Sequence, residues 1–392
     1  MKRRQVLKAL ALSVAIAAPG GGALAQEAVK VGLILPMTGP FATTGRQVEA
    51  GAKLYMATHG AEVAGKKIEL IVRDDAATAE QTRRIAQELV TRERVNVIAG
   101  FGHTPLAMAS APLATQGKVP MIVMAAGTSV ITEKSPFIVR SSFTLPQVTE
   151  PLATWAAKNG MKKVVTLVAD YAPGLDAEKA FSETFAKNGG TVVEQIRVPL
   201  ANPDFAPFLQ RVRDAAPDAV FSFVPSGVGS ALMKQFDDRG LDEAGIRLIA
   251  TGDVTDDDLL NGMGKVALGT ITTHHYSAAH DSPENKAFVE AFEAANNKMR
   301  PNFMAVGGYD GMHLIYEALK KTNGDTDGAG MVEAMKGLQW TSVRGPVSID
   351  PETRDIVQNV YFREVKEQDG QLWNVEFDKV DAVKDPVKAA TN

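Results

Sequence analysis

The sequence predicts an α/β protein with two doubly wound parallel sheets, each covered by helices on both faces. Two observations support this fold class. Short, nearly continuous apolar runs such as Val29–Pro36 alternate with segments of helical periodicity such as Gln47–His59, and this order is typical of parallel sheets. The same alternation starts again after Arg140. The chain therefore contains two similar α/β halves.

The first half is expected to contain four strands and three helices that alternate along the chain. The predicted strands are Val29–Pro36, Lys67–Arg73, Val95–Ala99 and Pro120–Met124, and the predicted helices are Gln47–His59, Ala79–Thr91 and Pro105–Gln116. Such a βαβαβαβ order places the strands side by side and parallel, with helices as crossovers.

The second half repeats this pattern and then adds a helical segment and a tail of strands. Its predicted strands are Lys163–Ala169, Thr191–Val198, Ala219–Val224, Arg247–Ala250 and Gly269–Thr273, and its helices are Gln147–Asn159, Asp176–Asn188, Phe205–Ala215 and Ser230–Arg239. The helices Pro283–Asn297, Met304–Thr322 and Gly330–Leu338 follow, then strands near Val347–Asp350 and Val357–Val365 and a turn at residues 368–371.

Residues 1–25 have the features of a cleavable signal peptide. Three cationic residues (2–4) precede an apolar stretch from Val6 to Ala18, and Ala23 and Ala25 supply the small residues of a cleavage site. We therefore expect export to the periplasm. Arg3 and Arg4 also resemble a twin-arginine signal, but the Sec route is favoured because nothing implies a cofactor that must be inserted before export.

The composition narrows the classes of function. Removal of residues 1–25 from 392 leaves 367 residues, enough for two domains. The formal net charge is −4, and the removed segment carries four cations and no acid, so the remainder carries −8. An acidic surface without a basic block argues against nucleic acid and anionic membranes as partners. The chain has no cysteine, so neither a lipid anchor nor a disulfide is possible.

Two loops that follow predicted strands are candidates for binding a ligand, because ligands of doubly wound sheets bind at the carboxyl ends of the strands. In the first loop, Thr104 is expected as an N-cap and Pro105 as the first helical residue. The N-terminus of that helix suits a carboxylate, although capping alone also explains Thr104. In the second loop the small residues 125–127 allow close approach of a ligand, whereas Thr128 and Ser129 alternatively cap the next helix.

Acidic and histidine residues in the second half are further candidates for binding a ligand or a metal. Asp256, Asp257 and Asp258 are explained as the first turn of a helix capped by Thr255. Asp253 lies outside that explanation, and it either faces the cleft or points away from it. The three histidines at 274, 275 and 280 have a spacing that fits no common zinc site, and no cysteine supports one. We expect no metal and no cofactor, and no catalytic motif is present.

Several segments in order resemble the periplasmic solute-binding proteins of ABC importers, in particular the Leu/Ile/Val-binding family with the type I periplasmic binding fold. They are VGLILPMTGPFATTGRQVEAGAKL, RDDAATAEQTRRIAQELV, GFGHTP, PMIVMAAGTSVIT, ADYAPGLDAEKAF and VRGPVSIDPETRDIVQNVYF. The resemblance extends from Val29 to Phe377. It implies an N-terminal lobe of residues 26–143 and 276–350, a C-terminal lobe of residues 144–275 and 351–385, and a tail of residues 386–392. The crossovers are expected near Ser142–Leu145, Thr273–Ser277 and Ile349–Ile356.

The resemblance also implies the residues that hold the ligand. The carboxylate would be held by the two loops, through His103, Thr104, Ala125, Ala126 and Gly127, with Thr128 adjacent. Other cleft positions correspond to Ser226 and Tyr309, with Tyr171 nearby. The position where the family carries an aromatic residue in its first loop is Thr44 here. Asp253 corresponds to the acidic residue that takes the ammonium group of an amino acid.

The expected function is that of the substrate-binding component of an ABC importer for a small carboxylate, enclosed between two closing lobes. Asp253 favours a branched-chain or other hydrophobic amino acid if it faces the cleft. The chain also contains segments that resemble DYGPG, SIDPETR and HDSPENK. Relatives with similar segments include proteins that bind aromatic carboxylates such as hydroxybenzoates, and this resemblance favours an organic acid as the ligand. The expected partner is the inner-membrane permease complex, and the protein is expected to be a monomer. A sensor subunit for a receptor, or a periplasmic enzyme with His103 or His275 as base, are the alternatives.

Overall fold

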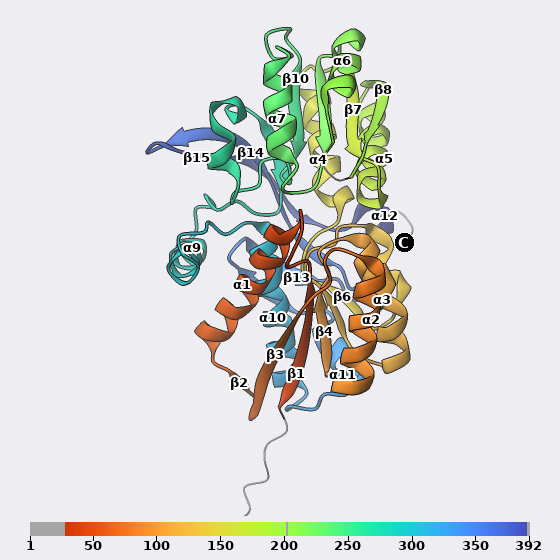
Figure 1. Ribbon diagram of the computed structural model, residues 1–392, viewed down its shortest axis with the longest axis vertical. Coiled ribbons are helices and arrows are strands. Elements are labelled where there is room, and N and C mark those ends of the chain that lie inside the picture. The colour runs from red at the N-terminus through yellow and green to blue at the C-terminus, as the bar shows by residue number, and fades with distance from the viewer. Residues whose placement is uncertain (1–27, 201–202, 390–392) are drawn as a thin grey trace, which may run out of the picture.

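The computed structural model describes residues 28–200 and 203–389, and it contains two sheets flanked by helices (Figure 1). The signal peptide predicted for residues 1–25 lies outside the described residues. The predicted α/β class is correct, and the two sheets correspond to the two halves of the sequence pattern. Within the described residues, no helix is long and apolar enough to cross a membrane.

The first sheet has six strands in the order β2-β3-β1-β4-β5-β6. Its strands are β1 (Val29–Leu35), β2 (Glu62–Val63), β3 (Lys66–Asp74), β4 (Val97–Gly100), β5 (Met121–Val123) and β6 (Ile138–Arg140). All neighbours are parallel except β2 and β3. Its helices are α1 (Ala42–His59), α2 (Ala79–Glu88, continued by a π-turn at Leu89–Glu93), α3 (Thr104–Gly117), α9 (Pro283–Ala295), α10 (Phe303–Lys321) and α11 (Gly328–Met335). In Figure 1, α2 and α3 cover one side of this sheet, and α1 and α10 lie on the other.

The second sheet has nine strands in the order β12-β13-β14-β11-β10-β9-β7-β8, with β15 paired to β14. Its strands are β7 (Lys163–Ala169), β8 (Thr191–Val198), β9 (Ala219–Phe223), β10 (Arg247–Thr251), β11 (Ile271–His274), β12 (Gln339–Ser342), β13 (Gly345–Ile349), β14 (Ile356–Gln368) and β15 (Gln371–Val383). Its helices are α4 (Leu145–Lys158), α5 (Ala172–Lys187), α6 (Ala206–Ala215), α7 (Gly229–Asp238) and α8 (Leu260–Met263), and α12 (Pro386–Ala389) follows β15. Strands β7 to β11 are mutually parallel, and β14 joins them antiparallel.

The tail of the chain forms a long hairpin that the sequence only partly indicated. The predicted turn is correct: Asp369 and Gly370 both have positive φ (51° and 73°) between β14 and β15, as a two-residue hairpin turn requires. Strand β14 is longer than expected, and β15 was not predicted. The predicted tail begins with α12, which packs against α4, and Figure 1 shows it beside the junction of the two halves.

The lobe boundaries stay a prediction, and strand pairing adds one feature to them. Strands β12 and β13, which the sequence analysis assigns to the N-terminal lobe, are hydrogen-bonded through β14 to the second sheet. The second sheet therefore extends from one predicted lobe into the other at the third expected crossover.

Helices α1 and α10 pack unusually closely because glycines lie at their contact. A Cβ atom on Gly51 would lie 1.9 Å from the Ala305 carbonyl oxygen, and one on Gly308 would lie 2.2 Å from the Val48 carbonyl oxygen. Only residues without a side chain allow this approach. The contact fixes the start of α10, which carries Met304, next to the first sheet.

The predicted helix cap at Thr255 is wrong. Helix α8 begins only at Leu260, and the Thr255 hydroxyl donates instead to the Asn374 side-chain oxygen at 2.8 Å. Asp256 and Asp257 are buried and have partners from distant segments: Asn302 donates to Asp256, and Asn374 donates to Asp257. The sequence could not show this, because these partners lie 46 and 117 residues away.

Candidate ligand-binding site

A small cavity lies where loops from the two sheets meet. Its lining comes from the segments after β4, β5, β6, β7, β9 and β10 and from the starts of α1 and α10. The lining residues are Thr44, Gly102, His103, Thr104, Ala125, Ala126, Gly127, Phe143, Leu145, Tyr171, Pro173, Phe223, Pro225, Ser226, Asp253 and Met304. The structure thus brings nine of the eleven predicted site residues together, and their contact with a ligand stays a prediction.

The first wall of the cavity is formed by the loops after β4 and β5. Thr104 is the first residue of α3, and His103 is the N-cap without a side-chain hydrogen bond. The expected capping role of Thr104 is therefore wrong by one position. Its hydroxyl instead lies 2.8 Å from that of Thr128. Thr128 does not line the cavity itself, but it fixes the rotamer of a residue that does.

Gly127 closes this wall tightly against the crossover segment. A Cβ atom at this position would lie 2.4 Å from Cδ2 of Leu145, so a larger residue would push that side chain away. The Gly127 carbonyl oxygen accepts from the Leu145 N–H at 2.9 Å. The loop backbone is consequently held at the cavity surface, where its N–H groups can approach a ligand.

The second wall comes from the loops of the other sheet and is largely aromatic. Tyr171 precedes α5, and its ring stacks on Phe223 with centroids 6.0 Å apart and planes 18° apart. Ser226 follows β9, and its hydroxyl has no hydrogen-bond partner of suitable geometry among the described residues. This wall offers flat aromatic faces together with the hydroxyl groups of Tyr171 and Ser226.

Asp253 faces the cavity, which resolves the alternative that the sequence left open. It follows β10 and is 4% exposed. Its Oδ2 atom accepts from the Thr251 hydroxyl at 3.0 Å and lies 3.5 Å from Nε2 of His274. Its Oδ1 atom has no hydrogen-bond or ion-pair partner within residues 28–200 and 203–389, so the carboxylate can still accept a hydrogen bond from a ligand.

The titratable groups around Asp253 are uncharged at neutral pH. Desolvation by the surrounding protein lowers the pKa of His103 to about 4, although the residue is partly exposed, and the Asp253 charge only partly opposes this. The same desolvation raises the pKa of Tyr171 well above 10. Burial also lowers the pKa of His274 to about 4. His103 and Tyr171 are therefore neutral hydrogen-bonding groups in the cavity.

The cavity is almost closed by its own side chains. Its volume is about 20 Å³, which is room for roughly one water molecule. A ligand of ten or more heavy atoms therefore requires the two walls to move apart or their side chains to shift. The walls belong to different sheets, so separation of the two halves is the movement that would admit it.

Tyr309 is not brought together with the other predicted site residues, because it lines a different cavity. Tyr309 lies five residues after Met304 on α10 and so projects from another side of the helix. Its ring packs against Tyr55 and Phe288, with centroids 4.9 and 5.1 Å away. That second cavity, of about 320 Å³, lies between α1, α9, α10 and β12.

Six lining residues larger than glycine were not assigned to the site from the sequence. They are Phe143, Leu145, Pro173, Phe223, Pro225 and Met304. Two of them lie in the first expected crossover, so a search of that segment for apolar residues would have found them.

The three histidines at 274, 275 and 280 were the residues considered for a metal site. No cluster of metal-binding side chains occurs in the described part of the chain, and the ring of His280 lies 2.8 Å from the carboxylate of Glu376.

Two α/β halves that meet at a small cavity beside their strand ends are typical of proteins that bind a small solute there. The chain belongs to the periplasmic binding protein family, whose model matches residues 28–371. It is 48% identical over 385 residues to the Leu/Ile/Val-binding protein homolog 6 of Brucella abortus, with 97% of this chain and 99% of that protein covered.

Two solved structures of Rhodopseudomonas palustris proteins are also similar to this chain. The solute-binding protein of an ABC transporter from strain BisB5, in complex with 3,4-dihydroxybenzoic acid, is 63% identical with a TM-score of 0.90, covering 92% of this chain and 99% of that one. The protein from strain HaA2, in complex with p-hydroxybenzoic acid, is 44% identical with a TM-score of 0.91, covering 93% and 100%. This protein is therefore a solute-binding protein of the ABC-transporter type.

Proposed function

We propose that this protein binds an aromatic carboxylate of the hydroxybenzoate class and delivers it to an inner-membrane ABC permease. The observation that carries the proposal is the chemistry of the cavity: one wall suits an anion, the opposite wall is aromatic, and Asp253 adds a single acidic acceptor. The similar proteins in complex with dihydroxybenzoic and hydroxybenzoic acids support the same ligand class.

The carboxylate would lie against the wall formed by the loops after β4 and β5. The N-terminus of α3, the Thr104 hydroxyl and the backbone at Gly127 lie there. Helix N-termini and free N–H groups favour negative charge. His103 is neutral when the site is empty, and a bound carboxylate would raise its pKa and strengthen the hydrogen bond.

The ring and its hydroxyl group would contact the other wall. Tyr171 and Phe223 provide aromatic surfaces there, and Phe143, from the segment after β6, provides a third beside Gly127. Aromatic rings pair favourably with another ring in offset-stacked or edge-to-face geometry. The phenolic hydroxyl would donate to Asp253. A hydrogen bond to a charged acceptor contributes about 1.5–3 kcal/mol, so this contact would select hydroxylated acids over benzoate.

A hydrophobic amino acid is the second candidate. Asp253 in the cavity can also accept from an ammonium group, and the relative at 48% identity carries the name Leu/Ile/Val-binding protein homolog. Three aromatic rings in so small a cavity favour a flat ligand over a branched aliphatic one. For the same reason we place the aromatic acid first.

The proposed place of action is the periplasm, with an importer rather than a sensor as the destination of the ligand. The signal-like residues 1–25 and the family to which the chain belongs support this. The family consists of transport proteins, and for that reason we propose no catalytic role for His103 or His275.

Isothermal titration calorimetry with 4-hydroxybenzoate, 3,4-dihydroxybenzoate, benzoate and leucine tests the ligand class. We expect binding of the two hydroxylated acids, weaker binding of benzoate and none of leucine. Thermal unfolding provides an independent readout, because free ligand at a hundredfold excess over its Kd stabilises the folded protein by about 2.7 kcal/mol. Binding of leucine without any aromatic acid would overturn the proposal.

A further inference from the structure

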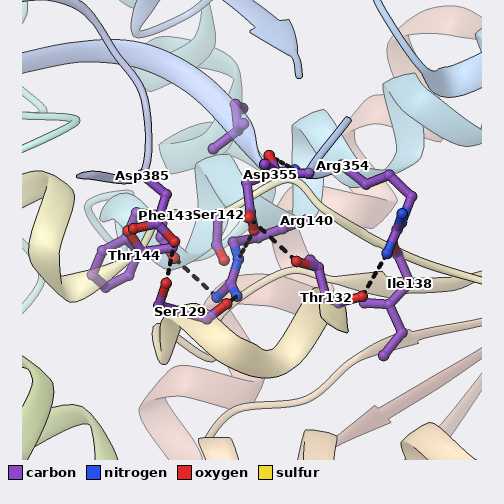
Figure 2. A network of polar contacts seen from close by, with 12 residues as sticks. Ser129, Thr132, Ile138, Arg140, Ser142, Phe143, Thr144, Arg354, Asp355 and Asp385 are labelled. Carbon is purple, nitrogen blue, oxygen red and sulfur yellow. Dashed lines mark hydrogen bonds and ion pairs between the residues drawn. The ribbon is translucent and has the colours of Figure 1, made fainter. Parts of the chain in front are cut away.

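Arg140 is a buried cation that lies beside the cavity loops without lining the cavity itself. It ends β6 and is 0% exposed, and Figure 2 shows its guanidinium among oxygen atoms of several segments. We propose that Arg140 is a positioning residue that turns the Gly127 N–H towards the carboxylate of the ligand. This inference rests on the proposed function, because it assumes that the carboxylate lies against the loop after β5.

The guanidinium holds that loop by its carbonyl groups. Nη1 donates to the Ala126 carbonyl oxygen at 2.5 Å, and Nη2 donates to the Thr128 carbonyl oxygen at 2.7 Å. Nη1 also donates to the Phe143 carbonyl oxygen at 3.1 Å. One planar, rigid fork of donors therefore fixes two peptide groups of the loop and one of the crossover segment.

The direction of these carbonyl groups determines the direction of the neighbouring N–H groups. In a trans peptide the C=O of one residue and the N–H of the next point in opposite directions. The Thr128–Ser129 peptide shows this arrangement, since its oxygen faces Arg140 while the Ser129 N–H donates to Asp176 at 3.2 Å. By the same geometry, the Ala126 oxygen facing Arg140 leaves the Gly127 N–H directed away from the guanidinium.

The Gly127 N–H remains available for a ligand. The Ala126 N–H is used by the Phe101 carbonyl oxygen at 3.1 Å. Among the described residues, the Gly127 N–H has no hydrogen-bond acceptor, and Gly127 lines the cavity. A buried N–H group without a partner is costly, so a carboxylate oxygen that accepts from it would gain affinity.

An acidic residue holds the guanidinium itself in place. Nε of Arg140 lies 2.7 Å from Oδ1 of Asp355, which is 1% exposed. The other oxygen of Asp355 accepts from Lys388 on α12 at 2.5 Å and from the Thr132 hydroxyl at 3.2 Å. In Figure 2 the Asp355 carboxylate lies between Arg140 and Thr132. This ion pair prevents free rotation of the Arg140 guanidinium, so the hydrogen bonds to the loop keep a fixed direction.

Arg344 provides a matched control. It is 1% exposed, donates to the Ser141 and Ser142 carbonyl oxygens at 2.6 and 3.1 Å, and pairs with Asp310 at 2.8 Å. It is therefore a second buried arginine that binds carbonyl groups next to the same crossover. None of its partners lines the cavity. Replacement of Arg344 therefore removes a comparable set of buried hydrogen bonds and leaves the contacts that orient Gly127 intact.

The experiment compares Arg140→Lys with Arg344→Lys for binding of 4-hydroxybenzoate and of the uncharged 4-hydroxybenzamide. Lysine keeps the charge but lacks the fork. We expect Arg140→Lys to lose roughly tenfold or more in affinity for the acid, as for one lost hydrogen bond to a charged group, and much less for the amide. The preference for acid over amide should shrink in Arg140→Lys and stay unchanged in Arg344→Lys. Equal losses for both ligands, or an unchanged preference, would overturn the inference.

A second measurement does not depend on a variant that folds. In the wild-type protein, the NMR signal of the Gly127 amide proton should move downfield when 4-hydroxybenzoate binds. Wild-type protein that binds the acid without such a shift overturns the role of Gly127, and with it that of Arg140. Wild-type protein that binds no aromatic acid overturns the proposed function instead, so the two failures are distinguishable.

Discussion

The side-chain amide of Asn302 donates to both carboxylate oxygens of Asp256 at 2.9 Å. Asn302 caps α10, beside the first sheet, whereas Asp256 follows β10 of the second sheet. The pair therefore connects the two halves next to the cavity, where Met304 and Asp253 lie. Asp256 is 1% exposed, and burial raises its pKa to about 7 although the Asn302 hydrogen bonds oppose the shift.

Asp256 should make stability fall as pH rises. Its folded-state pKa is about 7 against an ordinary value of 3.8, so its contribution is fully present below pH 4 and is lost as pH rises to about 7. The loss is at most about 4 kcal/mol. We expect Asp256→Asn to gain in unfolding free energy relative to wild type between pH 5 and pH 8, measured by urea denaturation. A difference that does not vary with pH would contradict this.

His274 should act in the opposite direction at acidic pH. Burial lowers its pKa from 6.5 to about 4. Between these two pH values the unfolded chain binds a proton at this histidine and the folded protein does not. The stability is present above pH 6.5 and is lost as pH falls towards 4, by about 3 kcal/mol. The neutral variant His274→Gln should lose less stability than wild type between pH 7 and pH 4.5 in the same urea experiment. Parallel curves for the two proteins would exclude His274 as the cause.

Asp253 should determine whether a ring hydroxyl increases affinity. We expect Asp253→Ala to bind 4-hydroxybenzoate about 10- to 100-fold more weakly, because a hydrogen bond to a charged acceptor is lost. Benzoate, which has no hydroxyl, serves as the matched ligand and should bind within about threefold of wild type. Calorimetry on both proteins measures the two ratios. If benzoate weakens as much as 4-hydroxybenzoate, Asp253 does not contact the hydroxyl.

The close packing of α1 on α10 should not tolerate a methyl group. Gly51→Ala would place a Cβ atom 1.9 Å from the Ala305 carbonyl oxygen, and we expect a loss of about 2 kcal/mol or more in unfolding free energy. The control is Gly262→Ala on α8, where the added Cβ meets nothing within 4 Å. That change should be neutral or stabilise by up to about 1 kcal/mol. Similar effects of the two substitutions would show that the helix contact adjusts without strain.

The sequence predicted most of the fold because the strands have a simple pattern. Buried strands such as β1 and β9 are nearly continuous apolar runs, interrupted once each by Lys30 and Ser222, and the helices between the strands keep a helical period. The strands that escaped prediction are short or at edges. Strand β6 has three residues and ends in Arg140, whose charge conceals its burial.

The sequence predicted the loops of the site better than the side chains in it. Loops after strands are located by topology, so Thr104, Gly127 and Asp253 could be found. Whether Tyr309 faces the cavity depends on the rotation of α10, which glycine packing against α1 sets. The partners of Arg140 and Asp256 come from distant segments, and no local pattern indicates such pairs.

The most direct test of the central claim is a crystal structure of the protein with 4-hydroxybenzoate. The account predicts the ligand between the two walls of the cavity, with its carboxylate at Thr104 and Gly127, its ring beside Tyr171 and Phe223, and its hydroxyl at Asp253. A ligand bound elsewhere, or one with its carboxylate at Asp253, would contradict the account.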